Sequence, residues 1–196
     1  MTSDMPARFY TILSVLNDLK DAFLTLLEKP NKQPALLMIY AFMDICAALS
    51  RDQSTKSNSR IFMEFIERFQ PPSRNPLPPS QLWAARSSLL HAFSPLGHHT
   101  RLGKAKPVFY YSWNEDKDAV RKSLELRGYA DFSLVSINQI KGIAIWGYNE
   151  MIRRVESDST FRDQVISNAE HLLVDYATFR VERFLRNADA ISTVSE

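Results

Sequence analysis

Residues 33–50 read QPALLMIYAFMDICAALS, and this stretch decides the fold class of the chain. Its apolar residues leave almost no polar face, which predicts a helix that is buried on nearly all sides. Asp44 interrupts the apolar run, which is shorter than the ~20 residues that span a bilayer. A buried carboxylate needs a cation or other donors, so we expect Asp44 to pair with Arg86 across a helical bundle, or otherwise with a hydroxyl or capping partner.

Periodic patterns on both sides of this stretch predict a mainly α-helical fold, an up-down bundle with extra C-terminal helices. The expected helices cover Arg8–Glu28, Gln33–Ser50, Ser59–Phe69, a segment that starts near Pro79 and ends before Pro95, Glu115–Arg127, Ser136 to about Glu156 with a capping box at its start, and Thr160 to about Leu185. Strands at Val108–Trp113 and Phe132–Val135 predict a small two-stranded ribbon, and the aromatic residues of the first strand fit either core packing or base stacking. We expect one domain, with a helical core at 1–95, a basic loop and ribbon at 96–135, and a C-terminal helical pair at 136–188.

The composition indicates a soluble domain from a reducing compartment. The chain has 196 residues, of which 45% are hydrophobic, and a formal net charge of +2. Only five glycines are present, which argues against a β-sandwich or barrel with many tight turns. Cys46 is the single cysteine and cannot form an intramolecular disulfide. Because no secretory signal is recognisable at the N-terminus, we expect a cytoplasmic protein without a membrane partner.

A second stretch, residues 83–95 with the sequence WAARSSLLHAFSP, carries the candidate catalytic residues. Ser87 and His91 are four positions apart, so on a helix the Ser87 hydroxyl could hydrogen-bond the imidazole and fix its tautomer. Arg86 and His91 are separated by roughly 140° around the helix axis. One helix therefore does not complete a site, whereas two copies across a two-fold axis would bring two arginines and two histidines together. A guanidinium and an imidazole suffice for RNA cleavage by the 2′-hydroxyl without a metal.

On these residues the chain resembles the HEPN superfamily. The stretch Leu82–His91 contains Arg-polar-x-x-x-His near the end of a bundle helix, which is similar to the family motif, with Ser87 where the family often has asparagine. The resemblance implies an endoribonuclease that needs no metal or cofactor, acts as a homodimer through this helix and leaves a 2′,3′-cyclic phosphate. Arg86 and His91 would be catalytic and Ser87 accessory. It also implies a toxin–antitoxin or phage-defence setting with an antitoxin protein as partner; the alternative is a non-catalytic module that binds a nucleotide or a protein.

The chain around this motif is basic. Between Arg68 and Asn114 the sequence contains no aspartate or glutamate. The candidate RNA-binding residues are Arg74, His98, His99, Arg101, Lys104 and Lys106. Such cations supply most non-specific affinity for a phosphate backbone, and the alternative is an ordinary solvated loop. The two adjacent histidines lack a carboxylate or cysteine that would complete a coordination shell, so we expect no metal site.

Overall fold

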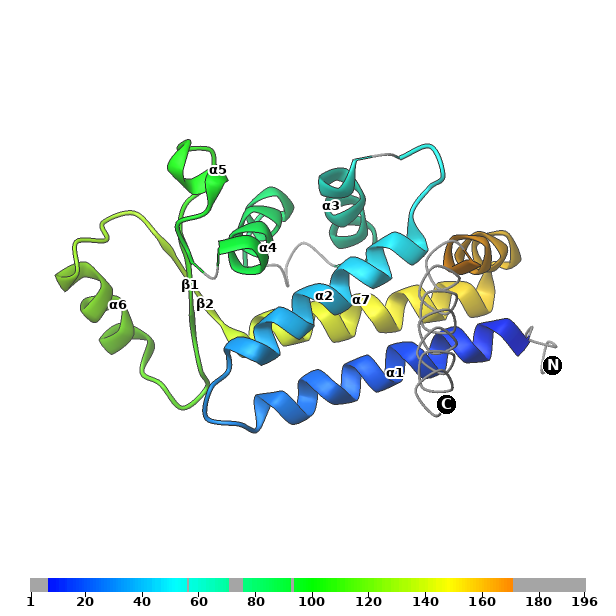
Figure 1. Cartoon of the computed structure of the whole chain (residues 1–196), viewed down its shortest axis with the longest axis horizontal. Coiled ribbons are helices and arrows are strands. Elements are labelled where there is room, and N and C mark those ends of the chain that lie inside the picture. Colours follow the sequence, from blue (N-terminus) through cyan, green and yellow to red (C-terminus); the bar gives the residue numbers. More distant parts are fainter. Residues whose placement is uncertain (1–6, 56, 71–75, 93, 171–196) are drawn as a thin grey trace, which may run out of the picture.

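The computed structural model describes residues 7–55, 57–70, 76–92 and 94–170, and it is mainly helical with one small sheet (Figure 1). The elements in chain order are α1 Ala7–Leu27, α2 Gln33–Ser50, α3 Asn58–Phe69, α4 Pro79–Ala92, α5 His98–Arg101, β1 Val108–Tyr111, α6 Lys117–Leu126, β2 Ser133–Ser136 and α7 Ile137–Ser157. Residues 159–170 form a further helix, and the rest of the expected helix Thr160–Leu185 lies outside the described residues. The prediction of an all-α class with a small β element is confirmed.

Helix α2 is the centre of the bundle. It packs against α1, α3 and α7, and its residues Ile39, Met43 and Cys46 are completely buried. Helices α1 and α2 run in opposite directions, and α7 runs beside α2 (Figure 1). Among the described residues, α2 is the one helix long and apolar enough to cross a membrane, but 56% of that span is already buried inside the protein. A core helix has the same composition, and the packing around α2 accounts for it.

The strands β1 and β2 pair in parallel, with Val108 opposite Ser133. Parallel strands cannot be joined by a tight turn and need a long crossover connection. Helix α6 is part of this crossover and lies at one end of the molecule, away from α1, α2 and α7 (Figure 1). On the sheet, the Phe109 ring packs edge-on against Phe132, with 5.6 Å between the ring centroids. The expected ribbon is therefore a small βαβ unit between α4 and α7.

Some short regions differ from the expected boundaries, and the second strand is shifted by one residue, from the expected Phe132–Val135 to Ser133–Ser136. The predicted strand Val108–Trp113 ends at Tyr111, because the Glu115 carboxylate accepts the backbone N–H of Ser112 and the chain turns there. The predicted loop at residues 96–107 contains the one-turn helix α5. A single turn is too short for a periodic pattern, which needs a window of about 11–18 residues.

Side-chain caps fix the start of two helices. The predicted capping box of α7 is confirmed, since the Ser136 hydroxyl accepts the Asn138 N–H and Gln139 Oε1 accepts the Ser136 N–H at 3.0 Å. The predicted helix Glu115–Arg127 begins later, at α6, because the Asp116 carboxylate accepts a backbone N–H of the first turn at 2.9 Å.

Candidate active site

Arg86 is held in place by Asp44. The Nε and Nη2 atoms of Arg86, on α4, donate to one carboxylate oxygen of Asp44, on α2, at 2.8 Å and 2.5 Å. The side chains of Arg86 and Asp44 are only 17% and 25% exposed. The predicted Asp44–Arg86 pair is therefore confirmed. It uses one edge of the guanidinium and leaves Nη1 without a hydrogen bond to any residue that the structure describes.

The ring of Trp83 packs against the flat face of the same guanidinium. The Arg86 Cζ atom lies 4.7 Å from the centre of the Trp83 ring. That ring packs in turn on Phe62 of α3, with 5.7 Å between centroids. Trp83 is not among the residues predicted to form the site, although its place three residues before Arg86 puts both on one helix face and could have revealed the contact. Stacking and the ion pair together fix the guanidinium plane, which suits recognition of a phosphate.

Asp44, Arg86 and His91 form one group of charges. Burial raises the pKa of Asp44 above its ordinary value, and the hydrogen bonds and charge of Arg86, followed by the charge of His91, offset part of that rise. His91 therefore lies within electrostatic reach of the carboxylate. Because Asp44 balances much of the Arg86 charge, a bound phosphate would be held by directed hydrogen bonds and by His91 as well as by Arg86.

His91 is exposed in the last turn of α4, so a substrate can reach its imidazole. Ser87 is half-buried one helical turn earlier. The hydrogen bond expected between Ser87 and His91 is not formed among the described residues, whereas the neighbouring Ser88 donates to the Ala84 carbonyl at 2.8 Å. The structure thus leaves the imidazole without the orienting hydroxyl that the sequence predicts.

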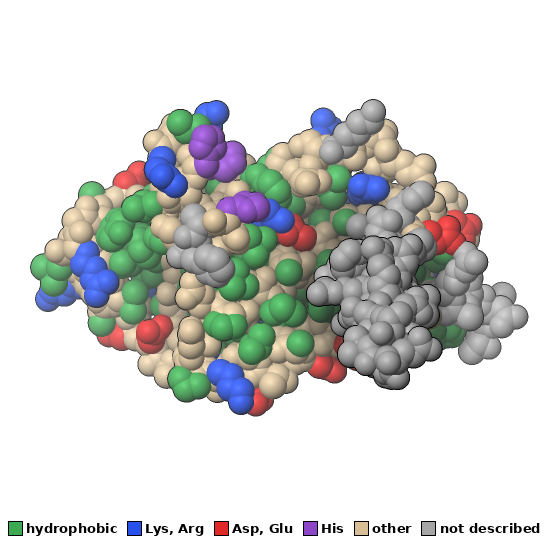
Figure 2. All heavy atoms as spheres, in the orientation of Figure 1, with side chains coloured by type: hydrophobic (Ala, Val, Ile, Leu, Met, Phe, Trp, Pro, Cys, Tyr) green, Lys and Arg blue, Asp and Glu red, His purple; other side chains and the backbone are tan. Residues whose placement is uncertain are grey.

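Close packing brings the basic segment next to α4. A Cβ atom at Gly97 would lie 2.1 Å from the Ser88 hydroxyl oxygen, so only glycine permits this approach. Helix α5 follows directly and packs on α4. Figure 2 shows the described histidine side chains over α4 and α5 on one face of the molecule, with lysine or arginine side chains near them. The candidate catalytic helix and the candidate RNA-binding segment therefore share a surface.

The predicted RNA-binding residues are mostly accessible. The exposed ones are His98, Arg101, Lys104 and Lys106, and His99 is half-buried. Arg74 lies outside the described residues. The Lys106 ammonium pairs with Asp131 at 2.6 Å, and both side chains are largely exposed. The described part of the chain contains no group of three His, Cys, Asp or Glu side chains that could hold a metal ion.

The aromatic residues of the first strand divide between core and surface. The Tyr110 hydroxyl lies 2.9 Å from the Tyr40 hydroxyl, and burial raises the pKa of Tyr110 to about 12. Trp113 is 53% exposed, and the Lys32 ammonium lies 4.6 Å from its ring centre. Tyr110 is therefore a core residue, while Trp113 presents an accessible ring.

Comparisons with family models, with curated proteins and with solved structures found no match to this chain. What the site can do chemically is therefore inferred from its own residues. A fixed guanidinium and an exposed imidazole next to a basic surface can bind a phosphodiester and transfer a proton.

Proposed function

We propose that this protein is a metal-independent endoribonuclease of the HEPN type. The observation that carries the proposal is the guanidinium of Arg86, locked against Asp44 and Trp83 beside an exposed His91. A positioned cation and a free imidazole are the two groups that cleavage by the 2′-hydroxyl requires. The substrate is cytoplasmic RNA, held through its phosphates by the basic residues of α5 and the turn that follows it.

In this reaction the ribose 2′-oxygen attacks the adjacent phosphorus, and the bond from phosphorus to the 5′-oxygen breaks. His91 removes the 2′-hydroxyl proton or protonates the departing 5′-oxygen. Arg86 donates to a non-bridging phosphate oxygen, whose negative charge grows in the transition state. The products are a 2′,3′-cyclic phosphate and a 5′-hydroxyl end.

A homodimer through α4 would complete the acid–base pair. One copy supplies one imidazole at this site, whereas the reaction uses both a proton acceptor and a proton donor. Exposure of His91 at the end of α4 leaves it free to meet its copy across a two-fold axis. The resemblance to HEPN proteins implies a toxin–antitoxin or phage-defence role for such a dimer.

A second candidate is a non-catalytic module that binds a nucleotide or a protein partner. The observation that favours it is the low exposure of Arg86 and its pairing with Asp44, because a purely structural arginine makes the same contacts. Such a protein would not cut RNA, and replacing His91 would change only its stability or its affinity for the ligand.

The deciding experiment incubates the full chain with tRNA, rRNA and mRNA in the presence of a chelator and maps the new RNA ends. Cleavage that leaves 2′,3′-cyclic phosphates supports the nuclease. His91→Ala should reduce the rate by about 10²–10⁴-fold, the usual contribution of a general acid or base. The matched control Lys117→Ala, at an exposed position on α6, should leave it unchanged. An unchanged rate in His91→Ala, or no cleavage of any RNA by the native chain, favours the binding module.

A further inference from the structure

Strand β1 has a free edge. The Pro107 carbonyl accepts the Ser133 N–H at 2.8 Å, which fixes which backbone groups face β2. In a parallel pair only alternate residues turn their N–H and C=O groups toward the partner strand, so Phe109 also faces β2. The N–H and C=O groups of Val108 and Tyr110 point the other way. β1 and β2 are the only strands in the described part of the chain, so no strand there pairs with this edge.

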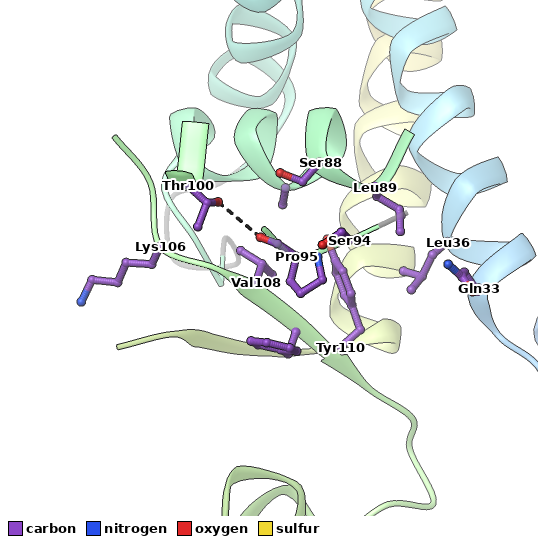
Figure 3. A pocket seen from close by; sticks show the side chains of 12 residues that line it. Gln33, Leu36, Ser88, Leu89, Ser94, Pro95, Thr100, Lys106, Val108 and Tyr110 are labelled. Carbon is purple, nitrogen blue, oxygen red and sulfur yellow. Dashed lines mark hydrogen bonds between the residues drawn. The ribbon is translucent and has the colours of Figure 1, made fainter. Parts of the chain in front are cut away.

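Two cavities follow this edge. The first has a volume of about 190 Å³ and lies between β1, α4 and the loop after α4 (Figure 3). The second has a volume of about 520 Å³ and lies between β1, the turn after it and the start of α2. The residues that line both are Gln33, Leu36 and Tyr110. Because they share these residues, the two cavities are neighbours, and we call them together the groove; Lys106 lines the first and Glu115 lines the second.

The wall of the groove opposite β1 is held by internal contacts. The Pro95 carbonyl accepts the Thr100 hydroxyl at 3.3 Å, as the dashed line in Figure 3 shows. Gly97, two residues after Pro95, packs directly on Ser88. The groove is therefore preformed, as binding sites usually are.

The geometry points to an interaction surface on which an extended segment of a partner protein adds a third strand beside β1. An extended polypeptide repeats its N–H and C=O groups at the spacing that Val108 and Tyr110 present, which a sugar–phosphate backbone does not. The protein already satisfies the next donor along the same edge, because the Glu115 carboxylate accepts the Ser112 N–H. The N–H groups of Val108 and Tyr110, which come before it on this edge, have no hydrogen-bond partner among the described residues.

The lining of the groove indicates the chemistry of the segment. Leu36, Leu89 and Val108 make its first cavity largely apolar, and of the described residues that line it Lys106 is the one that is charged. Among the described residues, Lys106 pairs with Asp131 alone, and this exposed pair is weak and easily exchanged. We therefore expect alternating apolar and β-branched residues, with an acidic side chain at the Lys106 end. The carboxylate of Glu115 at the other end disfavours a polyanionic nucleic acid.

The test uses a phage-displayed library of random peptides of about ten residues, longer than an average strand, selected on the full chain. The enriched peptide is then added to ¹⁵N-labelled protein, and backbone amide exchange is measured residue by residue. The amides of Val108 and Tyr110 should exchange rapidly in the free protein and slow by at least about tenfold with the peptide bound. The amides of Phe109 and Tyr111, which face β2, should be protected in both states.

A matched pair of variants isolates the edge hydrogen bond. Val108→Pro removes the groove-facing N–H without breaking a ladder bond to β2, whereas Val108→Ala keeps that donor. Both substitutions trim the apolar lining at position 108, so the edge hydrogen bond is measured by the difference between them: the peptide should bind roughly tenfold more weakly to the first variant than to the second. Selection of no alternating sequence, or a bound peptide that leaves exchange at Val108 and Tyr110 unchanged, overturns the proposal. Protection of the same amides by an oligouridine probe with no effect of the peptide also overturns it.

Discussion

Replacing Arg86 with methionine tests the central ion pair while keeping most of the packing. Methionine retains an unbranched side chain against Trp83 but cannot donate to Asp44. The Asp44 carboxylate then remains on α2 with three quarters of its side-chain surface covered and without its cation. We expect a loss of stability at pH 7 with no change of fold.

The size of the loss follows from the exposure of the pair. Removing one partner of a fully buried ion pair costs about 3–5 kcal/mol of stability. Asp44 and Arg86 keep 25% and 17% of their side-chain exposure, and the water that reaches the carboxylate lowers the cost to about 2–3 kcal/mol. For a chain of this length, such a loss lowers the melting temperature by roughly 4–12 °C.

The loss of stability also depends on pH, and the protonation of Asp44 determines whether it grows or shrinks as the pH falls. Burial already raises the pKa of Asp44, and removing Arg86 removes the main influence that lowers it. A carboxyl group whose pKa is raised by folding stabilises the fold below its unfolded pKa, and this contribution is lost as the pH rises through the folded pKa. The deficit of Arg86→Met should therefore be largest near neutral pH and shrink toward pH 3.8, the ordinary value for aspartate.

Urea unfolding of the native chain, Arg86→Met, Asp44→Asn and the double variant completes a thermodynamic cycle. Because neither charge remains in the double variant, adding Asp44→Asn should restore at least about 1 kcal/mol to Arg86→Met at pH 7. A stability of Arg86→Met within about 0.5 kcal/mol of the native chain would refute the reasoning. So would a second substitution that lowers the stability further.

Four further predictions concern α7 and the helix after it. Gly142→Ala should stabilise the protein by up to about 1 kcal/mol, because nothing lies within 4 Å of the new Cβ. Gly147→Ala should destabilise it by about 1–3 kcal/mol, because its Cβ would lie 2.8 Å from a ring on α3; equal thermal melts of the two variants would contradict this contrast. Ser136→Ala should cost about 1 kcal/mol in urea unfolding by removing the cap of α7, and no loss would show that the cap is dispensable. The Phe161 N–H lowers the pKa of Asp158, so the stability of the native chain relative to Asp158→Asn should fall as the pH drops below 3.8; a difference that does not vary with pH would exclude this contribution.

The sequence predicts two kinds of feature well in this protein: helices with a long apolar pattern, and pairs of opposite charges. The bounds of α2 match the expected helix at both ends, because its apolar run extends over several turns and stops at polar residues. The pairing of Asp44 with Arg86 follows from the cost of leaving a carboxylate in such a helix without a cation. Both predictions depend on free energies of several kcal/mol, from burying an apolar helix and from pairing a buried carboxylate, and tertiary packing does not override them.

Details that depend on side-chain rotamers or on the approach of distant segments are not predictable in this way. The four-residue spacing of Ser87 and His91 permits a hydrogen bond, but the structure does not form it. The three-residue spacing of Trp83 and Arg86 permits their stacking, but the orientation of the tryptophan ring depends on α3, whose Phe62 packs behind it. Which backbone groups of β1 lie on its free edge depends on the direction and register of the pairing, and nothing in the short strand sequences determines either.

The crossover between β1 and β2 limits how this part of the chain can change its length. Cutting residues 112–132 down to a two-residue turn would force the second strand to reverse, because such a turn joins only antiparallel strands. The present pairing would then be lost, and α7 would start from a different point. Lengthening α6 by whole turns of about 3.6 residues has no such consequence, since its far end projects away from the bundle (Figure 1). In this part of the protein, insertion is therefore tolerated where deletion is not.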